Sequence, residues 1–170
     1  MADVNIFHLY FPTIQYNASM NLKYENIYAD KMSLQIINAK SASQVEELFL
    51  NAIYNKIESI KLEGYAIYLE KETFGGFFST KTQVLSVEFK KSKIKQLSAC
   101  FFIQTNGSSI SFRLYKAIHK SYFKGLTEKP QTQRLEFIKN RLTSFEERDE
   151  FTSFDTLMEK LFDEGIKEFV

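Results

Sequence analysis

The chain has 170 residues, of which 44% are hydrophobic and 25% charged, and its net charge is +1. This composition is that of a globular protein rather than a disordered one, and the length suits one domain with its own core, here residues 1–170. The single cysteine, Cys100, excludes an internal disulfide framework and any multi-cysteine zinc site.

The near-neutral total hides a strong segregation of charge. Residues 81–141 contain thirteen Lys or Arg and only three acids, a net charge of +10, whereas residues 1–80 carry −3 and residues 142–170 carry −6. When positive and negative charges are separated in this way, the electric field of the protein concentrates partners of opposite charge near one surface and accelerates encounter with them. The charge pattern therefore indicates a binding function, and no catalytic or cofactor motif is specific enough to name a reaction.

The N-terminal quarter predicts three short strands. Their apolar and β-branched runs are Ile6–Phe11, which Pro12 ends or places at a sheet edge, Leu22–Tyr28 and Ser33–Asn38. A helix follows, because Ser43 and Glu46 have the spacing of a capping box and apolar residues then recur at helical period to about Leu62.

After Gly64 the hydrophobic period changes to two. Four strands are predicted, at Tyr65–Glu70, Gln83–Lys90, Gln96–Gln104 and Ser109–Lys116, and Asn106-Gly107 predicts a tight turn between the last two. In the last strand Phe112 and Leu114 alternate with Arg113 and Tyr115. The sequence thus predicts an antiparallel sheet with one apolar face and one solvated, charged face.

The C-terminal third is expected to be helical. Pro130 suits a first helical turn, and an acidic break over Glu146–Glu150 is expected to precede a last helix capped near Thr152 or Ser153. The resulting fold class is α+β. It is a mainly antiparallel sheet with one central-sequence helix and two C-terminal helices packed on one face.

Lysines of the basic block are interleaved with aromatic rings such as Tyr115, Tyr122 and Phe123. Lysine contacts phosphates, and exposed rings stack on unpaired bases, so the block predicts contact with RNA or single-stranded DNA. The alternative is that these residues form ordinary solvated faces, onto which the acidic C-terminal helix docks in the same molecule. The predicted nucleic-acid or partner-binding residues are Lys90, Lys91, Lys93, Lys95, Arg113, Tyr115, Lys116, Lys120 and Lys124.

The acidic tail, with nine acids between Glu146 and Glu168, alternates with an apolar stripe. Such a stripe normally belongs to a core, but it could instead be offered to a basic partner protein. An inhibitor or immunity protein that blocks a nuclease or a defence effector by protein–protein contact is therefore an alternative function.

Glu88-Phe89-Lys90 has the E-x-K spacing of metal-dependent nucleases, in which Glu70 on the neighbouring strand would share the polar face. This alternative is weak, because no aspartate lies between Asp30 and Asp149 to complete a metal site. The two histidines, His8 and His119, have no metal-ligand spacing.

Two other features favour structural roles. Cys100 lies in an apolar strand and is expected to be a small buried residue rather than a reactive thiol. Gly75-Gly76 lacks the pattern of a phosphate-binding loop, and its flanking phenylalanines, Phe74, Phe77 and Phe78, are expected to fold under the sheet or to form a contact patch.

The sequence predicts a non-enzymatic interaction protein that acts through its charged surfaces on nucleic acid or on a nucleic-acid-handling protein. No cofactor or metal is expected, and oligomeric state is left open.

No signal peptide is recognised and no apolar run approaches the roughly 20 residues of a membrane span, so a cytoplasmic location without membrane contact is expected. The bias toward Lys, Asn, Ile, Phe and Tyr is typical of AT-rich bacterial, phage or mobile-element genomes.

Overall fold

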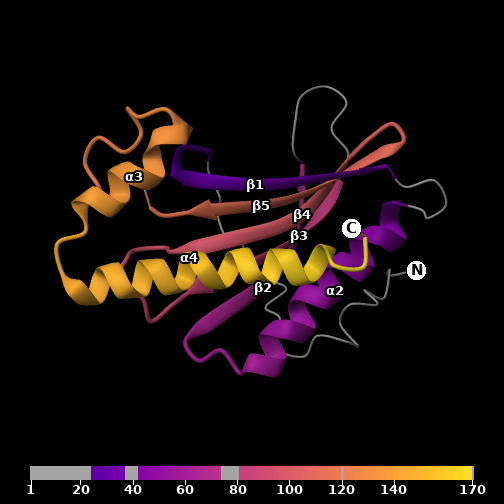
Figure 1. Ribbon diagram of the computed structural model, residues 1–170, viewed down its shortest axis with the longest axis horizontal. Helices are drawn as coiled ribbons and strands as arrows, with labels where there is room; N and C mark the ends of the chain where they lie inside the picture. Colours follow the sequence, from indigo (N-terminus) through magenta and orange to yellow (C-terminus); the bar gives the residue numbers. More distant parts are fainter. Residues whose placement is uncertain (1–23, 37–41, 74–80, 120, 170) are drawn as a thin grey trace.

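The computed structural model describes residues 24–36, 42–73, 81–119 and 121–169 (Figure 1). The elements in chain order are the short 3-10 helix η1 (Tyr24–Asn26), strand β1 (Ile27–Ile36), helix α2 (Ala42–Ile60), strands β2 (Tyr65–Thr73), β3 (Lys81–Phe89), β4 (Ser98–Asn106) and β5 (Ser109–Ala117), and helices α3 (Gln131–Arg141) and α4 (Phe145–Ile166).

The five strands form one antiparallel sheet in the order β1-β5-β4-β3-β2. Strands β2 to β5 are a meander, in which each strand pairs with the next along the chain. Strand β1 pairs with β5, so the connection through α2 carries the chain from one edge of the sheet to the other (Figure 1). The predicted α+β class is confirmed.

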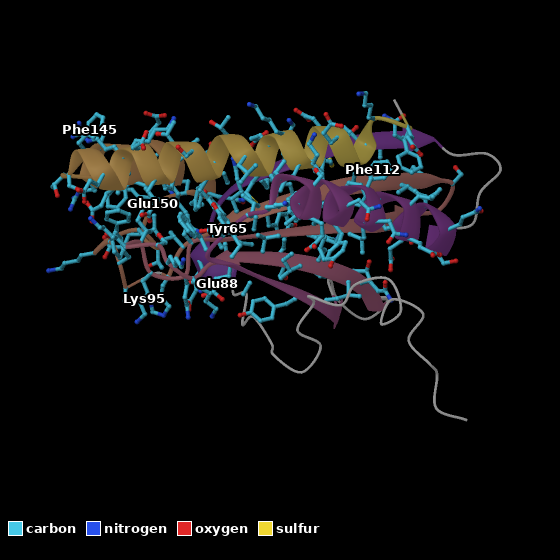
Figure 2. All side chains as sticks on the ribbon, turned by 90° about the horizontal axis from the view of Figure 1, so that it is seen from below. Tyr65, Glu88, Lys95, Phe112, Phe145 and Glu150 are labelled. Carbon is cyan, nitrogen blue, oxygen red and sulfur yellow. The ribbon has the colours of Figure 1, made fainter. Side chains whose placement is uncertain are left out.

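Helices α2 and α4 cover one face of the sheet, which we call the helix face (Figures 1 and 2). Phe49 and Ile53 of α2, Phe112 of β5 and Phe162 of α4 are all completely buried between these layers. The Phe49 ring lies edge-on to both Phe112 and Phe162, with ring centroids 5.0 and 6.1 Å apart. Burial of these large rings supplies much of the hydrophobic stabilisation of the fold.

The opposite face of the sheet, which we call the second face, differs from the prediction. Alternation along the strands is as expected, but this face is not simply a solvated, charged one. Val84, Cys100 and Phe102 form a separate buried apolar cluster there, and Phe102 packs edge-on to Tyr115 at 5.0 Å. The expectation that Cys100 is buried is confirmed, and its Sγ lies 3.3 Å from the Ser86 hydroxyl.

Two predicted boundaries are wrong. Within the described residues, Leu22–Tyr28 and Ser33–Asn38 are not two strands, because residues 24–26 form η1 and Ile27–Ile36 is one continuous strand. A bulge at Ile27/Ala29 shifts the register against β5. The polar stretch at Asp30 and Lys31 continues the strand, since an edge strand tolerates charged side chains.

The predicted acidic break before α4 does not exist. Ser144 caps the helix, accepting a hydrogen bond from the Glu147 backbone N–H, and Glu146 and Glu147 lie in the first turn. Carboxylates stabilise this position because they face the positive end of the helix dipole. The helix therefore begins at Phe145, well before the predicted cap at Thr152 or Ser153.

The predicted strand Ile6–Phe11 and the turn around Gly75-Gly76 lie outside the described residues. Among the helices that the structure describes, none is both long and apolar enough to cross a membrane.

Candidate nucleic-acid interface

Lys116 of β5 lies on the helix face, not on the outside. Its Nζ is 2.7 Å from Asp155 Oδ1 and 2.6 Å from Glu159 Oε1, both on α4, and its side chain is only 3% exposed. The neighbouring residues on this face are Ala29 of β1 and Ala99 of β4, whose small side chains leave room for the lysine stem. Lys116 was expected at a binding surface, and its amine is instead enclosed by carboxylates of the same chain.

Lys31 of β1 extends this group of charges. Its Nζ is 2.9 Å from Glu159 Oε2 and 2.7 Å from Asp163 Oδ1. We call Lys31, Lys116, Asp155, Glu159 and Asp163 the α4 charge cluster. The cluster ties both strands at this edge of the sheet to α4. The sequence did not identify Lys31 as a partner of the acidic helix. The available signal was its position between two strand-like runs, which is consistent with a charged residue on a strand.

The pKa of Glu159 reflects these contacts. Burial is the largest single effect and would raise it, but hydrogen bonds and Coulombic attraction from Lys116 and Lys31 together lower it by more, so the pKa lies below the ordinary value of 4.5. A carboxyl group with a lowered folded-state pKa contributes stability that is present above the unfolded-state pKa and is lost as the pH falls through the folded-state value.

We therefore expect the free energy of unfolding to decrease as the pH falls below about 4.5. In Glu159→Gln, which has no titrating group at this position, the decrease between about pH 5 and pH 3 should be shallower. Urea denaturation at each pH measures both profiles. Parallel profiles for the two proteins would contradict the role given to Glu159.

A second set of contacts joins the first turns of α4 to the loop between β3 and β4. Lys93 forms an ion pair with Glu146, and the Ser92 hydroxyl donates to Glu150. Nearby, Tyr122 Oη donates to Glu147 Oε1 over 2.6 Å. The hydrogen bond between Lys93 and Glu146 raises the pKa of the lysine and lowers that of the glutamate. Docking of the acidic helix on part of the basic block, one of the two alternatives left open by the sequence, is thus present.

The remaining lysines of this loop are exposed. Lys90, Lys91 and Lys95 are open to solvent, and Lys95 lies on the side of this sheet end that faces away from α4 (Figure 2). We call residues 90–97 the basic loop. Neither Lys91 nor Lys95 forms an ion pair with any acid in the described part of the chain. Lys124, in the segment after β5, is exposed as well.

Lys90, although exposed, has an acidic neighbour at the end of β3. Its Nζ lies 2.9 Å from Glu88 Oε2 and 5.8 Å from the centroid of the Tyr68 ring, and Tyr68 Oη donates to the same carboxylate over 3.4 Å. The hydrogen bond to Glu88 raises the pKa of Lys90, so the amine stays charged. Glu88, the acid of the E-x-K motif, is therefore held by Lys90 and Tyr68.

Backbone hydrogen bonds fix the shape of the basic loop. The N–H groups of Lys90 and Lys91 donate to the Gly64 carbonyl over 2.8 and 3.3 Å, and Ile94 and Leu97 anchor the loop in the core. Gly64 has a φ of +81°, and a Cβ there would lie 2.8 Å from Lys91 Cδ. Glycine is thus required both for this backbone conformation and for the close packing of the Lys91 stem.

The segment after β5 is tied to the basic loop. The His119 N–H donates to the Lys95 carbonyl over 3.0 Å, and the His119 ring contacts the Ser121 hydroxyl through Nδ1 at 2.5 Å. These bonds place His119 beside Lys95 at the same end of the sheet. The predicted site residue Lys120 lies outside the described residues.

Arg113 and Tyr115 lie on the second face, as their alternation predicted. Both are partly buried, and Arg113 stands between Met32 of β1 and Phe102 of β4. The Arg113 Nε is buried, and no hydrogen-bond partner for it occurs in the described structure. The structure thus separates the predicted residues by their surroundings. Lys93 and Lys116 pair with acids of α4, whereas the other lysines of the basic loop, Lys90, Lys91 and Lys95, do not. Arg113 and Tyr115 lie on the second face, and Lys124 is exposed in the segment after β5.

Metal-ligating side chains do not gather in the part of the chain that the structure describes, where no group of three or more His, Cys, Asp or Glu is placed to hold an ion. The side chain of Glu70, the second carboxylate of the proposed nuclease motif, lies outside that part.

Among the described residues, the exposed lysines of the basic loop are the candidate site that we take forward. Comparison with known proteins adds nothing to this assignment, since no protein-family model, no curated protein and no solved structure matches the chain.

Proposed function

We propose that this protein binds single-stranded nucleic acid through the basic loop, without catalysing a reaction on it. The observation that supports the proposal is the division of the lysines. The acids of α4 engage Lys31, Lys93 and Lys116. In the described structure Lys90, Lys91 and Lys95 are exposed and have no ion pair with α4, and Lys95 lies on the side away from α4 (Figure 2).

A net charge near zero argues against a nucleic-acid site, but the division of the lysines allows such a chain to present a positive surface. Most of the negative charge near the basic block belongs to α4, and much of it is compensated by internal ion pairs. Phosphate groups that approach the basic loop from the other side meet exposed ammonium groups, which attract them electrostatically.

The fixed backbone of the loop favours binding as well. Because hydrogen bonds to Gly64, Leu97 and His119 already order the loop, little conformational entropy is lost when phosphates bind. Lysine contacts phosphate as a point charge without reading sequence, so the expected binding tolerates different base sequences.

An inhibitor that presents the acids of α4 to a basic partner receives less support. Glu146, Glu147 and Glu150 in the first turns are occupied by Lys93, Tyr122 and Ser92 of the same chain.

As part of the proposal we place the protein in the cytoplasm of a bacterial or phage-infected cell, where single-stranded nucleic acid is accessible and a lone thiol stays reduced.

The test measures binding of a fluorescein-labelled single-stranded RNA and of the corresponding DNA by anisotropy over a range of salt concentrations. Contact with three phosphates predicts a slope of about −2 for the logarithm of affinity against the logarithm of salt concentration. Lys91→Glu with Lys95→Glu should weaken binding at least about tenfold, because two attractive contacts become repulsive.

The matched control is Lys160→Glu with Lys167→Glu, which makes the same change in net charge at positions toward the other end of α4. This control should bind nearly as tightly as the unaltered protein. Equal losses in the two variants, or no measurable binding at low salt, would refute the proposed site, and the second result would favour a protein partner.

A further inference from the structure

Strand β1 is an edge strand with unusually exposed apolar side chains. In the described sheet it pairs with β5 on one side only. Met32 is 54% exposed and Leu34 60% exposed, and strand alternation places both on the second face. An open edge with apolar side chains is a template for pairing with another strand, and proteins normally protect such edges.

In the part of the chain that the structure describes, the usual protections are missing from the central part of β1. Lys31 could guard the edge, but its amine is turned toward α4, where it pairs with Glu159 and Asp163 and lies 5.5 Å from the Phe162 ring centroid. Helix α3 covers only the beginning of the strand. There Arg134 Nη1 donates to the Ile27 carbonyl over 2.7 Å, and Gln131 Nε2 donates to Asp30.

We propose that β1 pairs with β1 of a second copy of this chain, giving a symmetric dimer in which the two sheets become one continuous sheet. Arg134 and Gln131 limit the uncovered stretch to residues 31–36, so the centre of a two-fold pairing lies close to Ser33. In a symmetric antiparallel pairing each residue keeps its face of the sheet, and the central residue therefore lies opposite its own copy.

The register that we propose is centred on Ser33. This register places Met32 opposite Leu34 of the second copy on the second face, and Leu34 opposite Met32, so all the exposed apolar groups meet. On the helix face it places Lys31 opposite Gln35. A register centred on Met32 would set Leu34 against Asp30, and one centred on Lys31 would set two lysines against each other, which is destabilising. A register centred on Leu34 would also bring apolar residues together, with Leu34 opposite its own copy and Met32 opposite Ile36, and cross-linking distinguishes it from the proposed register.

The first measurement is the mass of the full chain by sedimentation equilibrium over a concentration series. A mass twice that of the 19.9 kDa chain is expected at high concentration. Leu34→Lys should weaken dimerisation at least about tenfold, since the substitution alters two cross-strand pairs in each dimer. Ile60→Lys is the control, because Ile60 is another exposed apolar residue (40%) that lies at the end of α2.

Cross-linking tests the register directly. Residues that lie opposite each other in antiparallel strands have Cα atoms about 4.5–5.5 Å apart, which a disulfide can span. Ser33→Cys should therefore form a disulfide-linked dimer on mild oxidation. Gln35→Cys should not, because its two copies would be about 13 Å apart in this register. Cys100 is buried and does not compete.

A chain that stays monomeric throughout the concentration series overturns the proposal. This is the result expected if another segment of the same chain occupies the edge of β1. A dimer that forms equally well in Leu34→Lys also overturns it, because its interface would then lie elsewhere. A dimer in which the Ser33→Cys variant does not cross-link overturns the proposed register, whether or not the Gln35→Cys variant does.

Discussion

Replacing Lys116 by methionine is expected to lower the free energy of unfolding by about 3 kcal/mol, the low end of the range for removing one partner of a buried ion pair. Methionine resembles the lysine stem in size, so the apolar contacts with Ala29 and Ala99 are kept. What is lost is the cation between Asp155 and Glu159. The value is at the low end because both carboxylates are partly exposed and Lys31 still contacts Glu159.

Urea denaturation monitored by circular dichroism measures this loss. Lys91→Met is the matched control, since it removes an exposed amine and should change stability by less than about 0.5 kcal/mol. Adding Asp155→Asn and Glu159→Gln to Lys116→Met should restore part of the stability, because the triple variant no longer leaves two carboxylates without their cation. A loss under about 1 kcal/mol for Lys116→Met, or no recovery in the triple variant, would contradict the assigned role.

Gly165→Val is expected to destabilise the protein by a similar amount, about 3 kcal/mol, through overpacking where α4 meets α2. A Cβ at Gly165 would lie 2.7 Å from Ile53 Cγ1 and 2.9 Å from Phe49 Cε2, closer than real side-chain contacts allow. Phe49 and Ile53 are fully buried, so neither can move into solvent to relieve the clash. The two helices must separate, and the packing of the Phe49 ring against Phe112 and Phe162 is then loosened.

Thermal and urea unfolding of three variants tests this packing. Gly165→Ala should cost less than Gly165→Val, since its smaller overlap is offset by a gain of about 1 kcal/mol in helix propensity. Ser153→Val, at an exposed position of the same helix, should change stability by less than about 0.5 kcal/mol. If Ser153→Val is as destabilising as Gly165→Val, the effect comes from valine in a helix and not from the contact between α2 and α4.

The elements that local pattern specifies were predictable from the sequence. Strands β2 to β5 have apolar residues at period two and α2 has them at helical period, and the structure confirms all five. The errors fall where local signals conflict. Asp30 and Lys31 interrupt the apolar run of β1, and clustered acids at Glu146–Glu150 resemble a loop although they suit the first turns of a helix.

The candidate site was only partly predictable, because sequence gives the number of charges near a segment but not their partners. Lys91, Lys95 and Lys116 have the same chemistry and lie within one basic block. Strand alternation places Lys116 on the face of Leu114, and only the position of α4 turns it into a buried ion-pair partner. The exposure of Met32 and Leu34 was equally hidden, since it depends on β1 being an edge strand.

The sequence by itself determined the α+β class, most of the strands and the segregation of charge, since these follow from short-range periodicity and composition. The tertiary structure decided which charges face one another. Ion pairs form between residues far apart in the chain, such as Lys31 with Asp163 and Lys116 with Glu159. No local sequence pattern indicates which distant residues will pair. Among the described residues, the same long-range packing leaves lysines of the basic loop exposed and no strand paired with the outer edge of β1 over residues 31–36.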